Sequence, residues 1–281
     1  RLRWSSGGCL GGESDMTPLF RAAFICLMAL LPQAALAQRA PLAGIGVILM
    51  HGKGGQPGNN IASLAAALEA QGAKVMRPRM AWSGQQGQPT SYAVTYEAAL
   101  RAIDPAIAEL RKSGATKIVV AGQSIGANAA IAYGARYGKA LQGVIALAPG
   151  HTPDRWERNP QIARGLQEAR ALIAQGQGDK MHPFPDINQG RSFEVPGTPR
   201  AWLSFFDPHG PASMPKNAQA LPRIPFLWVI GRADMLAAAG ADYAFARAPS
   251  HPKSRYMEID SGHMDGPDKA IGVVMEWLKT I

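Results

Sequence analysis

The chain has 281 residues, of which 47% are hydrophobic and 17% charged, with only two cysteines. This composition is typical of a globular protein and excludes disordered, collagen-like and disulfide-scaffold chains. The formal net charge of +9 comes from basic residues scattered along the sequence, without the basic runs, zinc-finger spacings or aromatic patterns of nucleic-acid-binding domains. We therefore expect one large globular domain that does not bind nucleic acid.

The N-terminal segment has the layout of a secretion signal. Residues 16–37 begin with Met16, carry Arg21 as a basic residue, and continue as an apolar stretch that is too short to span a bilayer. The segment ends in Ala35-Leu36-Ala37, a pattern of small residues that signal peptidase recognises. This layout predicts cleavage after Ala37.

Cleavage there would define the mature protein as residues 38–281, and residues 1–15 would precede the start of translation. It would also remove Cys9 and Cys26, which leaves no thiol to mispair in an oxidising compartment. Use of Cys26 as a lipid anchor is the weaker alternative, because the preceding residue is the bulky Ile25. We therefore expect export to a bacterial periplasm or to the exterior, without a stable membrane anchor.

The mature chain alternates predicted strands and helices. Apolar runs predict strands at residues 44–50, 74–80, 117–121, 143–149, 224–230 and 255–259. Helical spacing of apolar residues predicts helices at residues 60–71, 92–112, 127–137, 236–246 and 269–279. This order predicts an α/β fold, with a mainly parallel central sheet flanked by helices on both faces. Residues 150–221 break the alternation, so we expect an insertion or cap after the strand at 143–149.

A glycine-bounded serine follows the strand at 117–121. The sequence Gly122-Gln123-Ser124-Ile125-Gly126 lies between that strand and a predicted helix, which is the setting of a nucleophile elbow. The sharp turn brings strand and helix so close that the residues two before and two after the serine must be small. The free N–H of Ile125, at the start of the helix, is then placed to stabilise an oxyanion.

A second glycine-rich loop follows the first buried strand. In Met50-His51-Gly52-Lys53-Gly54-Gly55 the glycines allow the backbone to approach a substrate, and the N–H of Lys53 is the expected second oxyanion donor. A phosphate-binding loop is the weaker reading, because Lys53 is followed by Gly54 where such a loop needs Ser or Thr. His51 is expected to brace the loop by hydrogen bonding.

Two further strand ends supply an acid and a histidine. Asp234 follows the strand at 224–230, and His263 follows the strand at 255–259. The chain order Ser124, Asp234, His263 is that of a serine-hydrolase triad, in which the histidine is the general base and the acid orients it. Asp207 is the alternative acid if the apolar run at 201–206 is a central strand.

These motifs together resemble the α/β-hydrolase superfamily, and most closely its exported members of the dienelactone-hydrolase-like or carboxylesterase-like kind. The resemblance implies an eight-stranded, mostly parallel sheet and a Ser124-Asp234-His263 triad. Two departures stand out. The lead of residues 38–43 leaves little room for the first two strands, so the sheet is expected to start at the third, and Gln123 stands where the superfamily often has His.

Substrate contacts are predicted from loops at the same strand ends. Trp82, His151 and Trp202 are candidates to line a pocket beside Ser124. The remaining histidines have no metal-ligand spacing, so we expect neither a metal nor a cofactor.

The sequence thus predicts a secreted serine hydrolase that cleaves a small-molecule carboxylic ester through an acyl-enzyme on Ser124. An amidase, a peptidase or a thioesterase would use the same three residues. A binding protein that kept the fold without turnover is the alternative from another class.

Overall fold

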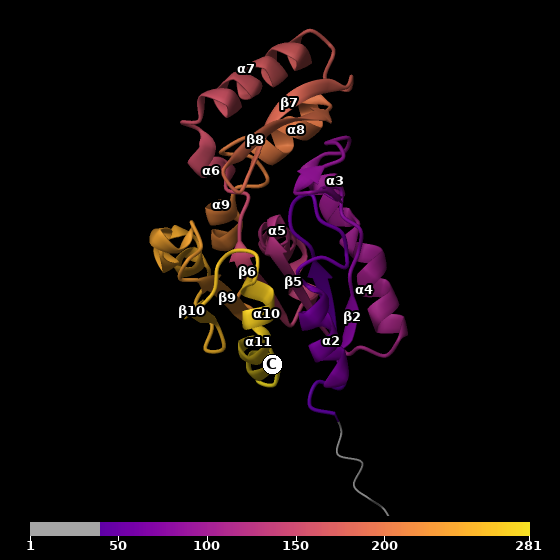
Figure 1. Cartoon of the computed structure of the whole chain (residues 1–281). Coiled ribbons are helices and arrows are strands. Elements are labelled where there is room, and N and C mark those ends of the chain that lie inside the picture. The colour runs from indigo at the N-terminus through magenta and orange to yellow at the C-terminus, as the bar shows by residue number, and fades with distance from the viewer. Residues whose placement is uncertain (1–39) are drawn as a thin grey trace, which may run out of the picture. The chain divides into compact units, whose positions relative to one another are not determined.

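Six parallel strands form the centre of residues 40–281, the part of the chain that the computed structural model describes (Figure 1). Across the sheet the order is β10 (Arg255–Ile259), β9 (Phe226–Gly231), β6 (Gly143–Pro149), β5 (Lys117–Ser124), β1 (Ile45–Met50) and β2 (Lys74–Met76). Because every neighbouring pair is parallel, the carboxyl ends of all six strands lie at one edge, where ligands bind in such sheets. The predicted leader at 16–37 and residues 1–15 lie outside the described residues.

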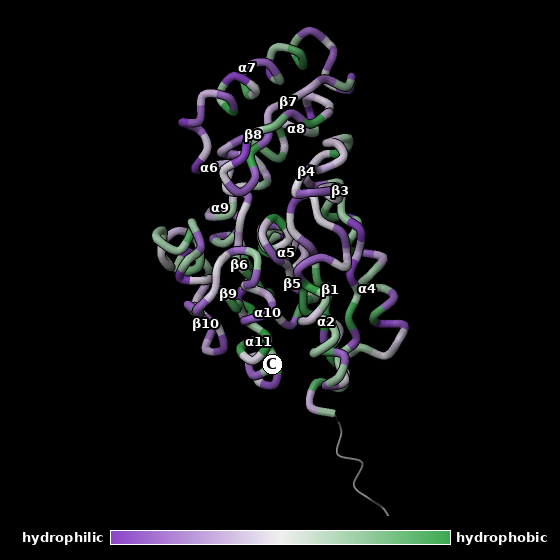
Figure 2. The backbone as a smooth tube through the Cα atoms, viewed as in Figure 1, coloured by the Kyte–Doolittle hydropathy of each residue, from purple (hydrophilic) through white to green (hydrophobic). Residues whose placement is uncertain are grey.

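Helices cover both faces of the sheet, because its strands are apolar on both sides. Within β1, Val47 and Leu49 pack in one apolar layer with helices α2 (Ala62–Ala70) and α11 (Ile271–Leu278). Ile48 and Met50 point into the opposite layer with α4 (Ile103–Lys112) and α5 (Ile125–Tyr137). Figure 2 shows this arrangement as apolar strands enclosed by helices with hydrophilic segments. The predicted α/β fold with a mainly parallel sheet is thus confirmed.

The sheet has six strands in the described residues, not the eight that the resemblance implied. Its first strand is β1, as expected from the short lead before it. Residues 84–89 form a separate small hairpin, in which β3 (Gly84–Gln85) pairs with β4 (Gln88–Pro89).

Two predicted helices differ from the structure. The helix expected at 92–112 begins later and is divided into α3 (Tyr96–Arg101) and α4, because the Thr95 hydroxyl accepts the Ala98 N–H and caps α3. The helix expected at 236–246 is wrong. That segment forms the short 3₁₀ turns η2 (Ala237–Ala239), η3 (Ala241–Tyr243) and η4 (Phe245–Arg247), since Gly240 at φ 64° interrupts any continuous helix.

The insertion expected after β6 contains four helices and a hairpin. These are α6 (Pro153–Trp156), α7 (Pro160–Ala174), β7 (His182–Asn188), β8 (Arg191–Gly197), α8 (Pro199–Phe206), α9 (Met214–Gln219). We call the elements from α6 to α8, residues 153–206, the cap, because they lie beyond one end of the sheet in Figure 1. The β7–β8 hairpin pairs only with itself among named strands, and α7 packs on α8.

No helix among residues 40–281 combines the length and the apolar character that crossing a membrane requires.

Candidate active site

Ser124 lies at the junction between β5 and α5, in a strained backbone conformation. Its φ of 58° and ψ of −121° place a non-glycine residue in a region that L-amino acids rarely occupy. A Cβ built on Gly122 would fall 2.3 Å from the Gly126 carbonyl carbon, and one built on Gly126 would fall 2.6 Å from Met50 O. The structure therefore requires both glycines and forms the sharp strand-to-helix turn that the sequence predicted.

The three residues of the predicted triad lie at the ends of three strands and meet at one place. Nδ1 of His263 lies 2.7 Å from Oδ2 of Asp234, and Oδ1 of Asp234 accepts the Leu236 N–H at 2.9 Å. Ser124 and His263 both border Gly150, where a built Cβ would fall 2.8 Å from the serine Oγ and 3.2 Å from the histidine Cε1. Nε2 of His263 is buried and has no hydrogen-bond partner in the described residues, the Ser124 hydroxyl included.

Asp207 is not placed to act as the triad acid. The apolar run at 201–206 belongs to helix α8 and not to a central strand, and Asp207 is the residue that ends this helix. Its carboxylate contacts Arg170 at 3.4 Å and accepts the His209 N–H at 2.9 Å. Only Asp234 of the two acids reaches His263.

Of the two residues predicted to supply the oxyanion donors, Lys53 lines the cleft at Ser124 and Ile125 directly follows that serine. Ile125 is the first residue of α5, so its N–H is one of the unpaired donors at the helix N-terminus. In the glycine-rich loop, the N–H groups of Gly54 and Gly55 donate to Trp82 O and Gly52 O, and Lys53 lines the cleft together with Ser124. The loop approaches the nucleophile closely, because a Cβ on Gly52 would fall 3.3 Å from that of Ser124.

His51 braces this loop from behind, as expected, and Trp82 assists it. The His51 Nδ1 lies 2.8 Å from Gly52 O, and its Nε2 lies 2.9 Å from Ser83 Oγ. The Trp82 ring is fully buried and donates its indole N–H to His51 O at 2.9 Å. The prediction that Trp82 lines a substrate pocket is therefore wrong, because its ring supports the loop instead.

Trp202 is also not a pocket residue. It is fully buried in the cap, where it stacks between Phe184 at 4.9 Å and Phe206 at 4.5 Å between ring centroids, and its N–H bonds Pro185 O. This aromatic stack forms the small core of the cap. The sequence could not separate this role from substrate contact, because both place an aromatic ring in the insertion.

His151 does line a pocket beside the serine, as predicted. The pocket has a volume of about 250 Å³, and its wall includes Ser124, His151, Trp156 and Leu236. Nε2 of His151 lies 2.8 Å from Phe205 O, so it donates a hydrogen bond to that carbonyl and Nδ1 is the unprotonated nitrogen. This bond fixes the imidazole against α8, where the cap borders the pocket.

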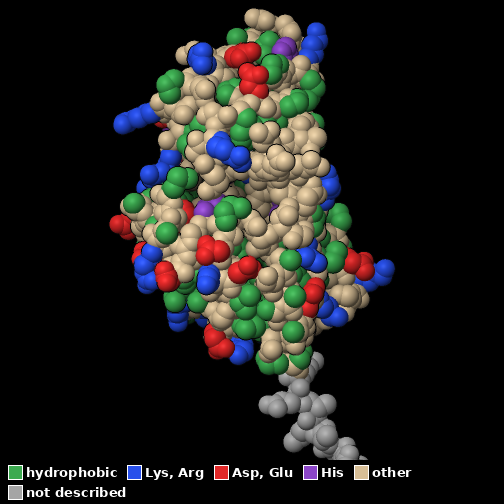
Figure 3. Space-filling view, viewed as in Figure 1, with side chains coloured by type: hydrophobic (Ala, Val, Ile, Leu, Met, Phe, Trp, Pro, Cys, Tyr) green, Lys and Arg blue, Asp and Glu red, His purple; other side chains and the backbone are tan. Residues whose placement is uncertain are grey.

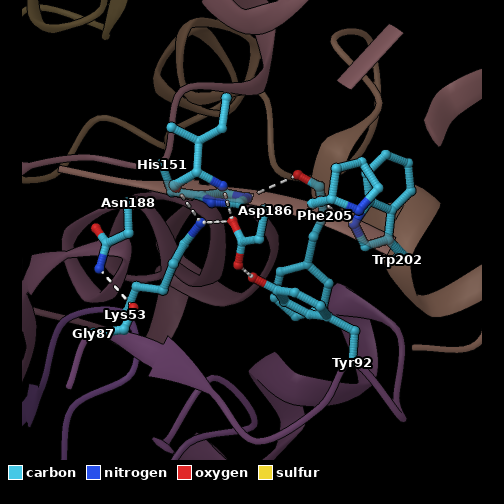
Figure 4. A network of polar contacts seen from close by, with 10 residues as sticks. Lys53, Gly87, Tyr92, His151, Asp186, Asn188, Trp202 and Phe205 are labelled. Carbon is cyan, nitrogen blue, oxygen red and sulfur yellow. Dashed lines mark hydrogen bonds and ion pairs between the residues drawn. The ribbon is translucent and has the colours of Figure 1, made fainter. Parts of the chain in front are cut away.

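A buried ion pair joins the glycine-rich loop to the cap (Figure 4). The Lys53 ammonium lies 2.5 Å from Oδ1 of Asp186 on β7 and donates to Ile187 O at 3.0 Å. The Tyr92 hydroxyl donates to the other Asp186 oxygen at 2.8 Å. Both charged side chains are almost fully buried, at 3% and 0% exposure. Burial raises the pKa of the Tyr92 hydroxyl well above its ordinary value, and the neighbouring Asp186 carboxylate raises it further.

Asp186 and Tyr92 are residues that the sequence analysis missed. The one available signal was Lys53 itself, because a lysine in a buried glycine-rich loop needs a counterion. Gln123 has a comparable supporting role: it is almost fully buried and its amide N–H donates to His263 O at 3.3 Å. It ties the nucleophile turn to the loop that carries the histidine.

The free energy of unfolding is expected to fall as the pH drops below about 6.5. Burial and the nearby Lys53 ammonium hold the pKa of His151 well below its ordinary value, and burial also lowers the pKa of His51. Below about pH 6.5 the unfolded chain therefore binds protons that the folded chain does not bind. The free energy of unfolding then falls by up to about 1.4 kcal/mol per pH unit for each histidine. Above that pH both histidines are neutral in both states and the full stability is present.

Urea unfolding between pH 8 and pH 5.5 checks this expectation. His151→Gln keeps a donor for Phe205 O and has no titratable group, so its unfolding free energy should depend less steeply on pH than that of the wild type. Equal pH dependence of the two proteins would contradict the neutral buried state of His151.

Comparisons with known proteins agree with this architecture. The family model described as serine aminopeptidase, S33, matches residues 45–180. Among solved structures, a metagenome-derived lipolytic enzyme superposes with a TM-score of 0.61 at 16% identity, over 85% of this chain and 95% of that one. A monoacylglycerol lipase from Paleococcus ferrophilus gives 0.59 at 19%, over 84% and 94%. A thermophilic esterase from Thermogutta terrifontis gives 0.52 at 22%, over 85% and 90%. No curated protein matches the sequence.

The sheet order, the serine in its strained turn and these similarities together show an α/β-hydrolase fold with a capped parallel sheet. In fold, the chain is similar to esterases and lipases of the α/β-hydrolase superfamily.

Proposed function

We propose that the protein hydrolyses a carboxylic ester through an acyl-enzyme on Ser124, with His263 as general base and Asp234 as its orienting acid. The observation that carries this proposal is the strained serine beside a histidine whose Nδ1 lies 2.7 Å from a buried carboxylate. Such a triad activates a hydroxyl group that is otherwise a weak nucleophile at neutral pH. The neighbouring lipolytic enzymes and esterases support ester bonds as the target.

The proposed reaction follows from the placement of these groups. The Ser124 oxygen attacks the ester carbonyl while Nε2 of His263 takes its proton and then returns it to the leaving alcohol. The N–H groups of Ile125 and Lys53 hold the negative oxygen of the tetrahedral intermediate, each worth roughly 3–4 kcal/mol of barrier. Water, deprotonated by His263, then attacks the acyl-enzyme, and the histidine returns the proton to the Ser124 oxygen as the acid is released.

The lining of the site favours an ester over the free N-terminus of a peptide. An aminopeptidase must hold a positively charged α-amino group, which requires a carboxylate beside the nucleophile. Asp234 is the sole carboxylate among the described residues that line the two pockets at Ser124, and His263 already occupies it. We therefore propose ester hydrolysis and not the aminopeptidase activity after which the matching family is described.

Labelling by a fluorophosphonate tests the proposal, because this reagent needs an activated serine and an oxyanion hole but no particular substrate. Intact-mass measurement of residues 38–281 should show one adduct on the wild type and none on Ser124→Ala. Parallel assays with acetyl esters, thioesters and aminoacyl amides of one leaving group should show the ester as the fastest substrate. A folded wild type without an adduct would contradict the proposal and favour a binding protein on the same fold.

We also propose that the protein is exported after cleavage behind Ala37, on the strength of the leader-like sequence at 16–37. Intact mass of the protein recovered outside the cytoplasm should give an N-terminus at Gln38.

A further inference from the structure

A second, larger cleft opens beside Ser124, and its chemistry differs from that of the pocket at His151. Its volume is about 520 Å³, and most of its uncharged side chains are carboxamides: Gln123, Asn59, Asn60, Gln86, Asn188, Gln189. None of the described residues that line it is Asp, Glu, Phe, Tyr or Trp. Figure 3 agrees, because the surface between the cap and the sheet is mainly tan, the colour of uncharged polar side chains and backbone.

Two hairpin tips carry glutamines into this cleft. Gln86-Gly87 joins β3 to β4, and Gln189-Gly190 joins β7 to β8. All four residues have positive φ, between 49° and 80°, which is the conformation of a two-residue hairpin turn of type I′. Such turns favour Asn, Asp or Gly at their first central position. The geometry of the turn therefore does not explain why each tip carries a glutamine. A role in ligand contact explains it, because the long amide side chain can reach into the cleft.

The two tips are bound to each other, so the backbone that carries their glutamines is held in place. Asn188 donates its side-chain N–H to Gly87 O at 2.8 Å, and Arg191 donates to Gln86 O at 3.2 Å. The approach is close, since a Cβ built on Gly87 would fall 3.0 Å from the Asn188 nitrogen. A site held in this way before binding loses less entropy when a ligand arrives.

We propose that this cleft binds the alcohol portion of the substrate, and that this portion is rich in hydroxyl groups, as in a saccharide or polyol. The inference rests on the proposed ester hydrolysis at Ser124. Each carboxamide offers donors and an acceptor, which matches hydroxyl groups that both donate and accept, whereas the absence of a carboxylate from the lining disfavours cations. The half-exposed Met264 thioether supplies an apolar contact for the C–H face of such a molecule.

The acyl portion then lies in the pocket at His151. That pocket is about half as large and is bordered by Trp156 and Leu236, so it accommodates a short acyl group. The substrate class that follows is a short-chain ester of a polyhydroxylated alcohol.

A pair of esters that differ only in their hydroxyl groups tests the inference. The probes are 6-O-acetylglucose and (tetrahydropyran-2-yl)methyl acetate, which share the ring oxygen and the acetyl group. Because Ser124→Ala cannot turn them over, its Kd for each ester reports the cleft alone. We expect the hydroxylated ester to bind at least about tenfold more tightly, since it gains several hydrogen bonds that the other ester cannot form. Equal Kd values would overturn the inference.

Glycine variants of the two tips locate the effect. Gln86→Gly and Gln189→Gly suit the positive φ and remove only the side chains, so the turns are retained. Together they should weaken binding of 6-O-acetylglucose about five- to tenfold or more and leave the deoxygenated ester unchanged. Gln219→Ala, on an exposed helix end of α9, is the matched control and should change neither Kd. An equal loss for both esters would indicate a structural role and contradict recognition by the glutamines.

The outcome is separate from that of the proposed function. If the wild type is labelled by the fluorophosphonate but shows no preference between the two esters, ester hydrolysis stands and the hydroxyl-rich substrate is rejected. If the label fails while Ser124→Ala still prefers 6-O-acetylglucose, the cleft is confirmed and the catalytic proposal is rejected.

Discussion

Asp234→Asn is expected to lower kcat for any ester substrate by about 10⁴-fold while the protein stays folded. Asparagine keeps the oxygen that accepts the Leu236 N–H, so the loop after β9 is preserved. Its amide nitrogen faces Nδ1 of His263, where a carboxylate oxygen now accepts, and this forces the histidine into the wrong tautomer. Nε2 then carries a proton and cannot accept that of Ser124.

Asp207→Asn is the matched control for this experiment. Asp207 contacts Arg170 and the His209 N–H at the end of α8, so its replacement should leave kcat within about twofold of the wild type. Both values are measured against Ser124→Ala, which sets the floor of the assay. A large loss in Asp207→Asn with a small one in Asp234→Asn would show that the acid has been wrongly assigned.

The strand ends of this fold could be predicted from the sequence because each depends on local residues. Continuous apolar runs identified β1, β5, β6 and β9, since a strand buried on both faces needs no polar residue. Once the strands were placed, Ser124, Asp234 and His263 were expected near one another, because parallel strands end at the same edge of the sheet.

The cap could not be predicted in the same way, because its structure depends on distant contacts. The strand β7 contains Pro183 and Pro185, which argue against a strand, and it is stabilised by pairing with β8. Asp186 lies 133 residues from Lys53, so no local pattern connects them. The alanine-rich segment at 236–246 shows the opposite error: its helical composition was outweighed by Gly240.

Lys53→Met is expected to lower the free energy of unfolding by about 3–5 kcal/mol, because it leaves a buried carboxylate without its counterion. Asp186 has no exposed surface, and the Tyr92 hydroxyl and the Ile187 N–H supply hydrogen bonds but no positive charge. The variant keeps the backbone N–H of residue 53 and most of the side-chain volume. Urea denaturation at pH 7.5 measures the loss.

The double variant Lys53→Met/Asp186→Asn separates the charge from the packing. Asparagine keeps an acceptor for the Ile187 N–H and places an amide N–H that can donate to the Tyr92 oxygen, without a buried charge, so the double variant should be more stable than Lys53→Met alone. Arg200→Met removes the exposed ion pair with Asp179, at 52% and 84% exposure, and should change the unfolding free energy by less than about 1 kcal/mol. If Lys53→Met proved as mild as Arg200→Met, the ion pair would not hold the cap to the glycine-rich loop.

If instead the double variant recovers stability but remains slow in ester hydrolysis, Lys53 and Asp186 also position the oxyanion donor, since the same residue carries both the ion pair and that N–H.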